Sequence, residues 1–407
     1  MSKKSPQLRF EGFTDDWEER KLSELIQKGG SGGTPKSTNK TYYDGDIPFL
    51  GISDISKSNG YIDDTEKHIS EKGLNNSSAW IVPKGAISLA MYASVGKLAI
   101  LNIDAATSQA FYNMVFEYES IRDYVYHRLG RANDLGEWTK LISTGTQANL
   151  NADKVKNFEI QVPQSIDEMK DISTFFNQLD IFITLQQRKL DLLKEQKKGF
   201  LQKMFPQNGA KVPELRFAGF ADDWELRKLG TLVEELNENI SGVSGFPIAT
   251  SSRKGLFLQN EYFSGERTGI DKNINFHKVP VGYITYRHMS DDSIFKFNKN
   301  SFETPVLVSK EYPVFKSNSN SDQEFLLIHL NNSPLFLKFS TMQKLGGTRV
   351  RLYFKNLKTY ELYAPTFEEQ KQIGSFFSLL NHTITLHQRK LDLLKEQKKG
   401  FLQKMFV

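Results

Sequence analysis

The sequence predicts an α+β protein made by tandem duplication, in which two strand-rich domains are joined by two long helices. The main observation is an unchanged internal repeat: residues 187–205 read QRKLDLLKEQKKGFLQKMF, and residues 388–406 read the same nineteen letters. The openings of the two halves also match, with PQLRFEGFTDDWEERKL from Pro6 and PELRFAGFADDWELRKL from Pro213. Self-similarity of this length indicates that a whole folding unit was duplicated.

Length and composition agree with two cores. At 407 residues the chain exceeds the usual size of one hydrophobic core. Its 30 Phe, 15 Tyr and 4 Trp supply enough apolar surface for two. We expect a first domain, a central spacer helix, a second domain and a C-terminal spacer helix, at residues 1–163, 164–205, 206–365 and 366–407.

The middles of the two halves differ. Residues 26–145 and 233–346 show almost no similarity to each other, although similar frames surround them. One scaffold with two unlike surfaces is typical of a protein that reads two different targets.

A helical pattern closes each half. The polar, acidic stretches SIDEM and TFEEQ follow Pro163 and Pro365, and acidic residues favour a helix start because they meet its exposed amides. Apolar residues then recur at alternating spacings of four and three, which predicts a coiled coil. Two such helices would most simply pair antiparallel with approximate twofold symmetry, although each could instead pack on its own domain. The predicted seam is Ile172, Phe176, Leu179, Ile183, Leu190, Leu193 and Phe200 with Ile373, Phe377, Leu380, Ile384, Leu391, Leu394 and Phe401.

Polar residues interrupt this seam at equivalent places. Gln186 and His387 could set the register as a buried polar layer, or be merely tolerated near the seam. Lys197 and Lys398 are the other two exceptions.

The sequence lacks the motifs of several enzyme classes. Cysteine is absent, the glycine-rich segment 29–37 has the wrong spacing for a phosphate loop, and no HExxH or GxGxxG occurs. The acidic pair Asp291-Asp292 and the pairs in the two DDW segments suggest metal-dependent nuclease chemistry, but a polar turn before a buried Trp explains the DDW pairs more simply. We therefore expect a binding protein with no catalytic residue, no metal and no cofactor of its own.

No targeting or membrane segment is apparent. The start, MSKKSPQLRFEGF, lacks the apolar core of a secretory signal, and no run of 18 apolar residues occurs. We expect a cytoplasmic protein with no membrane partner. The net charge of +5 suits a polyanionic partner without requiring one.

Several segments together resemble the specificity subunit of type I restriction-modification enzymes. They are GGTPKSTNKTYYDGDIPFLGISDI from Gly32, PKGAISLAMYASVGKLAIL from Pro83, GTQANL with VKNFEIQVP, and the duplicated helices. The resemblance covers essentially the whole chain. It departs from the family pattern in the second middle, which reads NENISGVSGFPIATSSRKGLF.

The resemblance implies a non-catalytic DNA reader. Each middle would be a target-recognition domain for one half of a bipartite, asymmetric site in double-stranded DNA, and the helices would fix the spacing between the halves. Two methyltransferase subunits and, in the full complex, two translocase-nuclease subunits would join it. Those partners would use S-adenosylmethionine, ATP and magnesium.

Candidate DNA contacts are side chains in loops that can hydrogen-bond base edges or phosphates. For each of them the alternative is a solvated surface residue or, for the tyrosines, core packing. The matched Trp17 and Trp224 are better explained as core. The candidates are Lys36, Tyr42, Tyr43, Tyr92, Ser94, Lys97 and Gln109 in the first middle, and Arg253, Lys254, Arg267, Arg287, His288 and Lys310 in the second.

Two other functions are compatible with parts of this pattern. A coiled-coil scaffold could join two protein-binding domains without any nucleic acid, and salt-dependent duplex binding would distinguish it from a DNA reader. A self-sufficient nuclease is disfavoured by the missing motifs.

Overall fold

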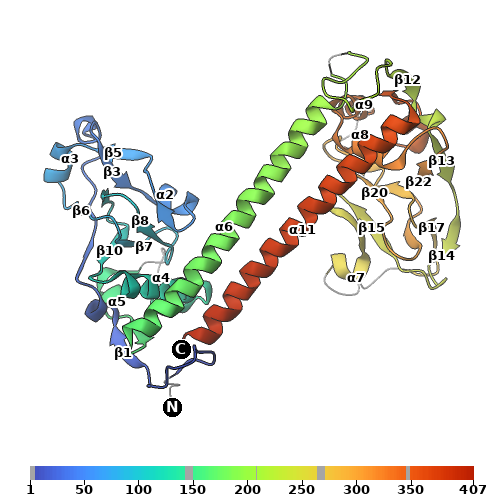
Figure 1. Ribbon diagram of the computed structural model, residues 1–407. Helices are drawn as coiled ribbons and strands as arrows, with labels where there is room; N and C mark the ends of the chain where they lie inside the picture. The colour runs from blue at the N-terminus through green and yellow to red at the C-terminus, as the bar shows by residue number, and fades with distance from the viewer. Residues whose placement is uncertain (1–4, 143–149, 208, 264–270, 345–348) are drawn as a thin grey trace. The chain divides into compact units, whose positions relative to one another are not determined.

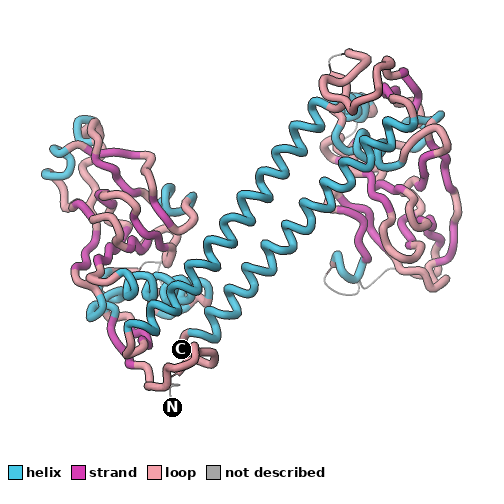
Figure 2. Tube along the Cα trace, viewed as in Figure 1, coloured by secondary structure: helices cyan, strands magenta, loops and turns pink. Residues whose placement is uncertain are grey.

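The chain forms two compact units, each containing part of both long helices. The computed structural model describes residues 5–142, 150–207, 209–263, 271–344 and 349–407. Unit 1 comprises residues 1–189 and 388–407, and unit 2 comprises residues 190–387 (Figure 1). The helices expected at 164–205 and 366–407 are α6 (Ile166–Lys203) and α11 (Phe367–Met405). Strands are concentrated in the body of each unit (Figure 2).

Unit 1 contains two sheets and a short pair of strands. One sheet has the order β2-β10-β7-β8-β4 and the other β5-β3-β9-β6; their contacts are antiparallel except for β4 with β8 and β3 with β9. The strands of the sheets are β2 (Lys28–Ser31), β3 (Ile47–Leu50), β4 (Tyr61–Ile62), β5 (Lys67–Ile69), β6 (Ile81–Val82), β7 (Ile87–Ala90), β8 (Leu98–Leu101), β9 (Ala105–Thr107) and β10 (Phe111–Val115). The pair is β1 (Glu18–Lys21) with β11 (Glu159–Val162).

Strand β7 lies at the centre of this unit and is buried on both of its faces. All four residues of its ISLA sequence are buried. Because side chains alternate across a strand, Ile87 and Leu89 enter one core cluster and Ala90 enters another. Ser88 is also buried, and its hydroxyl donates to Asn113 Oδ1 at 2.8 Å. The helical segments of the unit are α1 (Leu22–Leu25), η1 (Lys40–Tyr42), α2 (Ile52–Lys57), α3 (Glu71–Asn75), α4 (Glu119–Asp134), η2 (Glu137–Lys140) and α5 (Ala152–Lys156).

Unit 2 has a different arrangement of strands between similar ends. Its sheets have the orders β13-β22-β18-β20 and β14-β17-β21, with separate pairs β15-β16 and β19-β23. The pair β12-β24 repeats the antiparallel pairing of β1 with β11. The strands are β12 (Glu225–Lys228), β13 (Val233–Leu236), β14 (Asn239–Ser241), β15 (Ala249–Ser252), β16 (Gly255–Leu258), β17 (Asn275–Val279), β18 (Ile284–Tyr286), β19 (Met289–Ser290), β20 (Phe297–Lys299), β21 (Val306–Ser309), β22 (Val314–Ser317), β23 (Val350–Arg351) and β24 (Glu361–Ala364).

Two consecutive helices in unit 2 begin at good capping residues. Asp322 accepts a hydrogen bond from the Phe325 amide at the start of α8, and Ser333 accepts one from the Phe336 amide at the start of α9. Pro334 occupies the first turn of α9, where a missing amide proton costs nothing. The helical segments are η3 (Leu229–Thr231), α7 (Gln259–Tyr262), α8 (Gln323–Asn332), α9 (Pro334–Met342) and α10 (Phe354–Leu357).

The two long helices pair in opposite directions within each unit. In unit 1 the rings of Phe175 and Phe401 meet edge-on with centroids 5.0 Å apart, and Lys398 pairs with Asp180. In unit 2 the rings of Phe200 and Phe376 meet at the same separation. All the predicted seam residues are buried or partly buried. Of the two arrangements left open by the sequence, the contacts between the helices confirm the antiparallel pairing within each unit. Within the described residues, no helix is both long and apolar enough to span a membrane.

The LRF segment at the start of unit 1 connects the ends of both helices. The Leu8 amide donates to the Lys404 carbonyl at 2.9 Å, in the last turn of α11. The Arg9 guanidinium makes two hydrogen bonds, of 2.6 and 2.8 Å, to Glu168 in the first turn of α6. The Trp17 indole also donates to Glu168, at 3.3 Å. The last carbonyls of a helix lack partners within it, so the Leu8 amide satisfies one that would otherwise stay open.

We call these contacts, Leu8 with Lys404 and Arg9 with Glu168, the clamp of unit 1. Unit 2 has an equivalent clamp in which the two helices exchange roles. The Leu215 amide donates to the Lys203 carbonyl at 2.8 Å, near the end of α6. The Arg216 guanidinium makes two 2.7 Å hydrogen bonds to Glu369, in the first turn of α11. Glu369 is fully buried, and its carboxylate raises the pKa of Arg216 through these hydrogen bonds. Trp224 is buried as predicted.

We predict that Arg216→Ala lowers the free energy of unfolding by about 3–5 kcal/mol, because it leaves the buried Glu369 carboxylate without its cation. Urea unfolding measures this loss. Arg227→Ala is the matched control: Arg227 pairs with Glu225 on the exposed surface, so its loss should cost less than about 1 kcal/mol. Equal losses in the two variants would contradict the role of the buried pair.

Two buried histidines make stability depend on pH. Burial lowers the pKa of His127 and of His329 to about 4 each, and in His127 the Lys398 charge adds to this while Asp180 opposes it. Their Nε2 atoms hydrogen-bond Asn177 and the Tyr360 hydroxyl, both at 2.8 Å. An unfolded histidine has a pKa of about 6.5, so the unfolded chain binds more protons between pH 6.5 and 4. Stability therefore falls as the pH drops through this window.

We predict that His329→Gln flattens the loss of stability between pH 7 and pH 5, by on the order of 2 kcal/mol. Urea unfolding at several pH values measures the slope. His382→Gln, at an exposed position of α11, is the control and should leave the slope unchanged. An identical slope in the His329 variant and the parent protein would refute the prediction.

Candidate nucleic-acid interface

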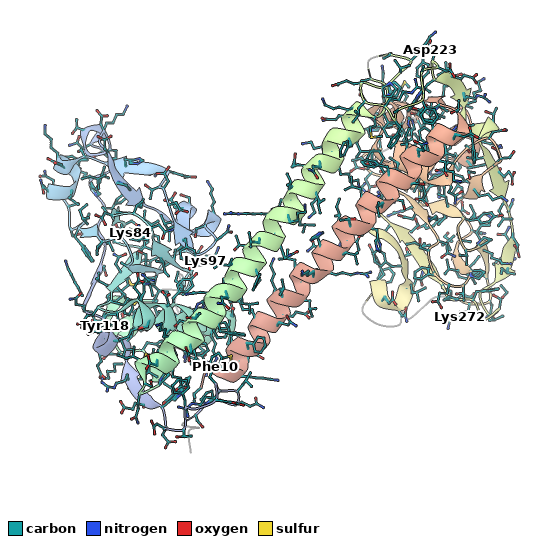
Figure 3. The ribbon with its side chains drawn as sticks, viewed as in Figure 1. Phe10, Lys84, Lys97, Tyr118, Asp223 and Lys272 are labelled. Atoms are coloured by element: carbon teal, nitrogen blue, oxygen red, sulfur yellow. The ribbon has the colours of Figure 1, made fainter. Side chains whose placement is uncertain are left out.

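In unit 1, three of the predicted contact residues occupy one exposed connection. Tyr92, Ser94 and Lys97 all lie between β7 and β8, and all are exposed (Figure 3 marks Lys97). Ala93 and Ser94 have φ angles of +39° and +75°, in the left-handed region that residues other than glycine rarely adopt. Strained backbone of this kind persists only where the surroundings impose it, and it is concentrated at functional sites.

Hydrogen bonds join this connection to neighbouring loops. The Met91 amide donates to the Ala110 carbonyl at 2.7 Å, which attaches the connection to the β9–β10 loop. In that loop the predicted residue Gln109 is exposed, and its side chain accepts a hydrogen bond from the Thr34 hydroxyl. Lys36 lies two residues beyond Thr34 and is exposed. The structure therefore gathers Lys36, Gln109 and the β7–β8 connection at one edge of the unit.

The glycines before Thr34 allow this close packing. A Cβ atom on Gly32 would lie 2.2 Å from the Thr107 carbonyl oxygen, and one on Gly33 would lie 2.4 Å from the Ala79 amide nitrogen. The glycine-rich segment, which has the wrong spacing for a phosphate loop, therefore serves close backbone contact.

The two tyrosines predicted near Lys36 are less accessible. Tyr42 and Tyr43 are both half-buried. The Tyr43 hydroxyl donates to the Pro35 carbonyl at 2.7 Å, and its ring packs edge-on against Phe49. Tyr43 thus supports the segment that presents Lys36.

In unit 2, the predicted residues differ in their exposure. Arg287 lies between β18 and β19, and Lys310 lies between β21 and β22; both are exposed. His288 is only 6% exposed, and its ring stacks on Tyr353 with centroids 5.8 Å apart. Burial lowers the pKa of His288. The histidine is therefore poorly placed to reach a groove, whereas its neighbour Arg287 points to the surface.

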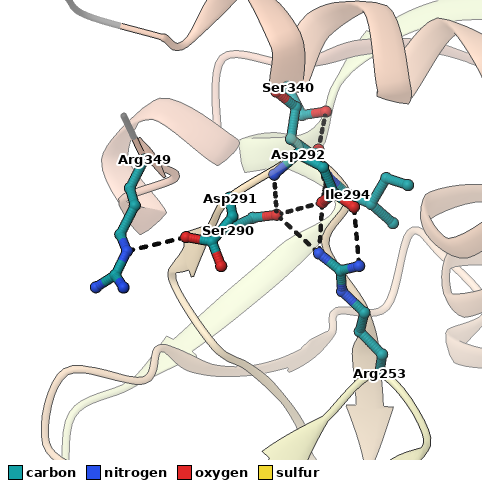
Figure 4. A network of polar contacts seen from close by, with 8 residues as sticks. Arg253, Ser290, Asp291, Asp292, Ile294, Ser340 and Arg349 are labelled. Atoms are coloured by element: carbon teal, nitrogen blue, oxygen red, sulfur yellow. Dashed lines mark hydrogen bonds and ion pairs between the residues drawn. The ribbon is translucent and has the colours of Figure 1, made fainter. Parts of the chain in front are cut away.

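A network of ion pairs surrounds the Asp291-Asp292 turn (Figure 4). The Arg253 guanidinium binds both carboxylate oxygens of Asp292, one of them at 2.8 Å, and Arg349 donates to Asp291 at 2.9 Å. Arg253 lowers the pKa of Asp292 to about 2, so Asp292 stays ionised. Each aspartate has an arginine partner, and no cluster of metal-ligating side chains occurs among the described residues.

Of the remaining predicted residues, Lys254 is exposed at the turn between β15 and β16. Arg267 lies outside the described residues, as does most of the GTQANL segment.

The prediction missed a row of side chains next to Arg287. Arg349, Arg351 and Tyr353 are exposed and alternate with buried apolar residues. Arg351 lies opposite Met289, because β23 pairs antiparallel with β19. The signal was present in GTRVRLYF, whose alternation of polar and apolar residues is typical of a half-buried strand.

The sequence matches the family described as Type I restriction modification DNA specificity domain, over residues 14–195 and 222–396. The chain belongs to this family. It carries two specificity domains, in agreement with the duplication in the sequence. The loops around Lys97 in unit 1 and those around Arg287 in unit 2, which we call the loop edges of the two units, belong to different domains.

Relatives match parts of the chain. The specificity subunit of the type I restriction enzyme MjaIX from Methanocaldococcus jannaschii is 31% identical over 182 residues, which are 44% of this chain and 41% of the relative. The HindI specificity subunit from Haemophilus influenzae is 29% identical over 148 residues, 36% of this chain and 32% of the relative. The chain thus matches less than half the length of these relatives.

A solved structure shares the fold along the chain. The crystal structure of the type I restriction-modification S subunit from M. genitalium aligns with a TM-score of 0.65, covering 99% of both chains at 12% identity. At this identity the likeness shows the fold of the paired specificity domains.

Proposed function

We propose that this chain is the DNA-recognition subunit of a type I restriction-modification complex, and that it reads a bipartite, asymmetric site with one half per specificity domain. One observation carries the proposal: the loop edges of the two units differ, and each has exposed cations. The opening segments and long helices that surround these loops are repeated. Two different edges would read two different half-sites. Exposed arginines and lysines in loops suit both base edges and phosphates.

The long helices would act as the spacer between the half-sites. Each is continuous, with 38 residues in α6 and 39 in α11. At 1.5 Å per residue, α6 is roughly 57 Å long, more than one turn of duplex DNA. A split site requires a fixed separation, and paired helices are stiff enough to supply one.

We assign catalysis to partner subunits. In this proposal the chain binds and positions DNA, while two methyltransferase subunits modify a base in each half-site and two translocase-nuclease subunits join for restriction. S-adenosylmethionine, ATP and magnesium would be bound by those partners. The complex would be cytoplasmic.

Exposed leucines on the helices support docking of the methyltransferases. Leu185 and Leu393 of unit 1 are 52% and 54% exposed, and Leu192 and Leu386 of unit 2 are 52% and 49% exposed. The repeat makes these positions equivalent in pairs, Leu185 with Leu386 and Leu192 with Leu393. Exposed apolar side chains that recur by duplication suit two copies of one partner.

Comparing DNA methylation in cells with and without this gene tests the function. We expect one bipartite motif to lose methylation in both halves when the gene is removed. Replacing residues 26–145 with the middle of another specificity subunit should change one half of the motif and keep the other. Unaltered methylation in the deletion strain would refute the proposal.

Arg287 and Arg351 provide a test at the level of residues. Among the described residues neither arginine has a carboxylate partner, so both are available to DNA. We expect each of Arg287→Ala and Arg351→Ala to cost about 1–3 kcal/mol of binding to the cognate duplex, and to relax only the half-site read by unit 2. Binding assays with duplexes mutated in one half at a time measure this. Arg227→Ala, away from the edge on β12, is the control; equal relaxation of both halves would contradict the assignment.

A further inference from the structure

The duplication places equivalent lysines in different surroundings. Lys197 of α6 and Lys398 of α11 are the same residue of the repeat. In unit 1, Lys398 donates to Asp180 at 2.5 Å. The residue of unit 2 that corresponds to Asp180 is Asn381, which carries no charge. Among the described residues, Lys197 therefore has no acidic partner in the place where its counterpart has one.

A second substitution leaves space beside Lys197. In unit 1, Asn177 donates to Asp123 at 2.9 Å and accepts from His127 at 2.8 Å, so polar groups fill this region. The corresponding residue of unit 2 is Ser378, whose side chain is shorter. Ser378 and Asn381 line a cavity of about 510 Å³.

The cavity contains a second unpartnered cation. Lys296 lines it together with Lys197, and neither lysine forms an ion pair or hydrogen bond with the described residues. Lys197 is half-buried and Lys296 is exposed at the cavity rim; partial desolvation lowers the pKa of both side chains, and the charge of Lys197 lowers that of Lys296 further. The acidic residue in the lining, Glu324, is engaged by Lys299. Positive charge is thus gathered without compensation.

We propose that this cavity binds a small phosphate-bearing anion, between pyrophosphate and a nucleotide in size, with Lys197 and Lys296 as its main contacts. An anion between the two lysines would relieve the repulsion between their positive charges. The Ser378 hydroxyl and the Asn381 amide supply further donors at the lining. The volume lies within the usual range for small-molecule sites, and a DNA duplex is too wide to enter it.

Calorimetric titration of the full chain with pyrophosphate tests the site. We expect saturable binding, and at least tenfold weaker binding in each of Lys197→Gln and Lys296→Gln. Lys198→Gln is the matched control, because Lys198 is the next residue of the same helix and is exposed. Absence of binding to the parent protein, or equal affinity in the three variants, would overturn the proposal.

Asn381→Asp gives a test that does not remove a lysine. It restores the acid that faces the equivalent lysine in unit 1, so the new carboxylate should pair with Lys197 and compete with the anion. We expect at least tenfold weaker pyrophosphate binding and a higher Tm in the absence of pyrophosphate. Undiminished affinity in this variant would count against the site.

Duplex binding by the same variants distinguishes a free anion from the DNA backbone. We expect cognate duplex affinity to be unchanged in Lys197→Gln and Lys296→Gln. Weaker duplex binding without any pyrophosphate binding would mean that these lysines contact DNA, and would overturn the inference. The proposed DNA-recognition function does not depend on this result.

Discussion

The buried arginine–glutamate pair is the interaction on which each unit depends. Arg9 with Glu168, and Arg216 with Glu369, join the opening segment of a unit to the first turn of one long helix. A neighbouring amide satisfies a carbonyl in the last turn of the other helix. Both helix ends are therefore attached to one short segment. Because an unpaired buried charge costs several kcal/mol, alternative attachments of the helices are strongly disfavoured.

This constraint explains why the frame is repeated while the middles differ. The clamp and the strand pair beside it use residues at the ends of each half, so the strands between them can be rearranged without loss of the attachment. The sheet orders of the two units differ accordingly. Loops at the edge of a fixed frame can change their side chains at little cost to stability. A protein that reads two different half-sites needs loops that can change while the helices and strands that carry them stay the same.

The same duplication shows how a polar helix contact can become a binding site. Lys398 has an acidic partner in Asp180, whereas Lys197 faces Asn381 and shares a cavity with Lys296. A structural ion pair in one unit thus corresponds to uncompensated charge in the other. The two specificity domains therefore differ where they pack on the long helices as well as in their loop edges.

The sequence by itself determined the duplication, the helix seam, the burial of the matched tryptophans and the family, because each leaves a pattern that persists along the chain. It also placed Arg287 and Lys97 on exposed loops. It did not reveal that His288 is buried, that Asp292 holds Arg253, or that Arg351 lies opposite Met289. Those facts depend on strand pairing between distant segments, and such pairing leaves no local signal. The buried clamp was hidden for the same reason, since its arginine and glutamate are more than 150 residues apart in each half.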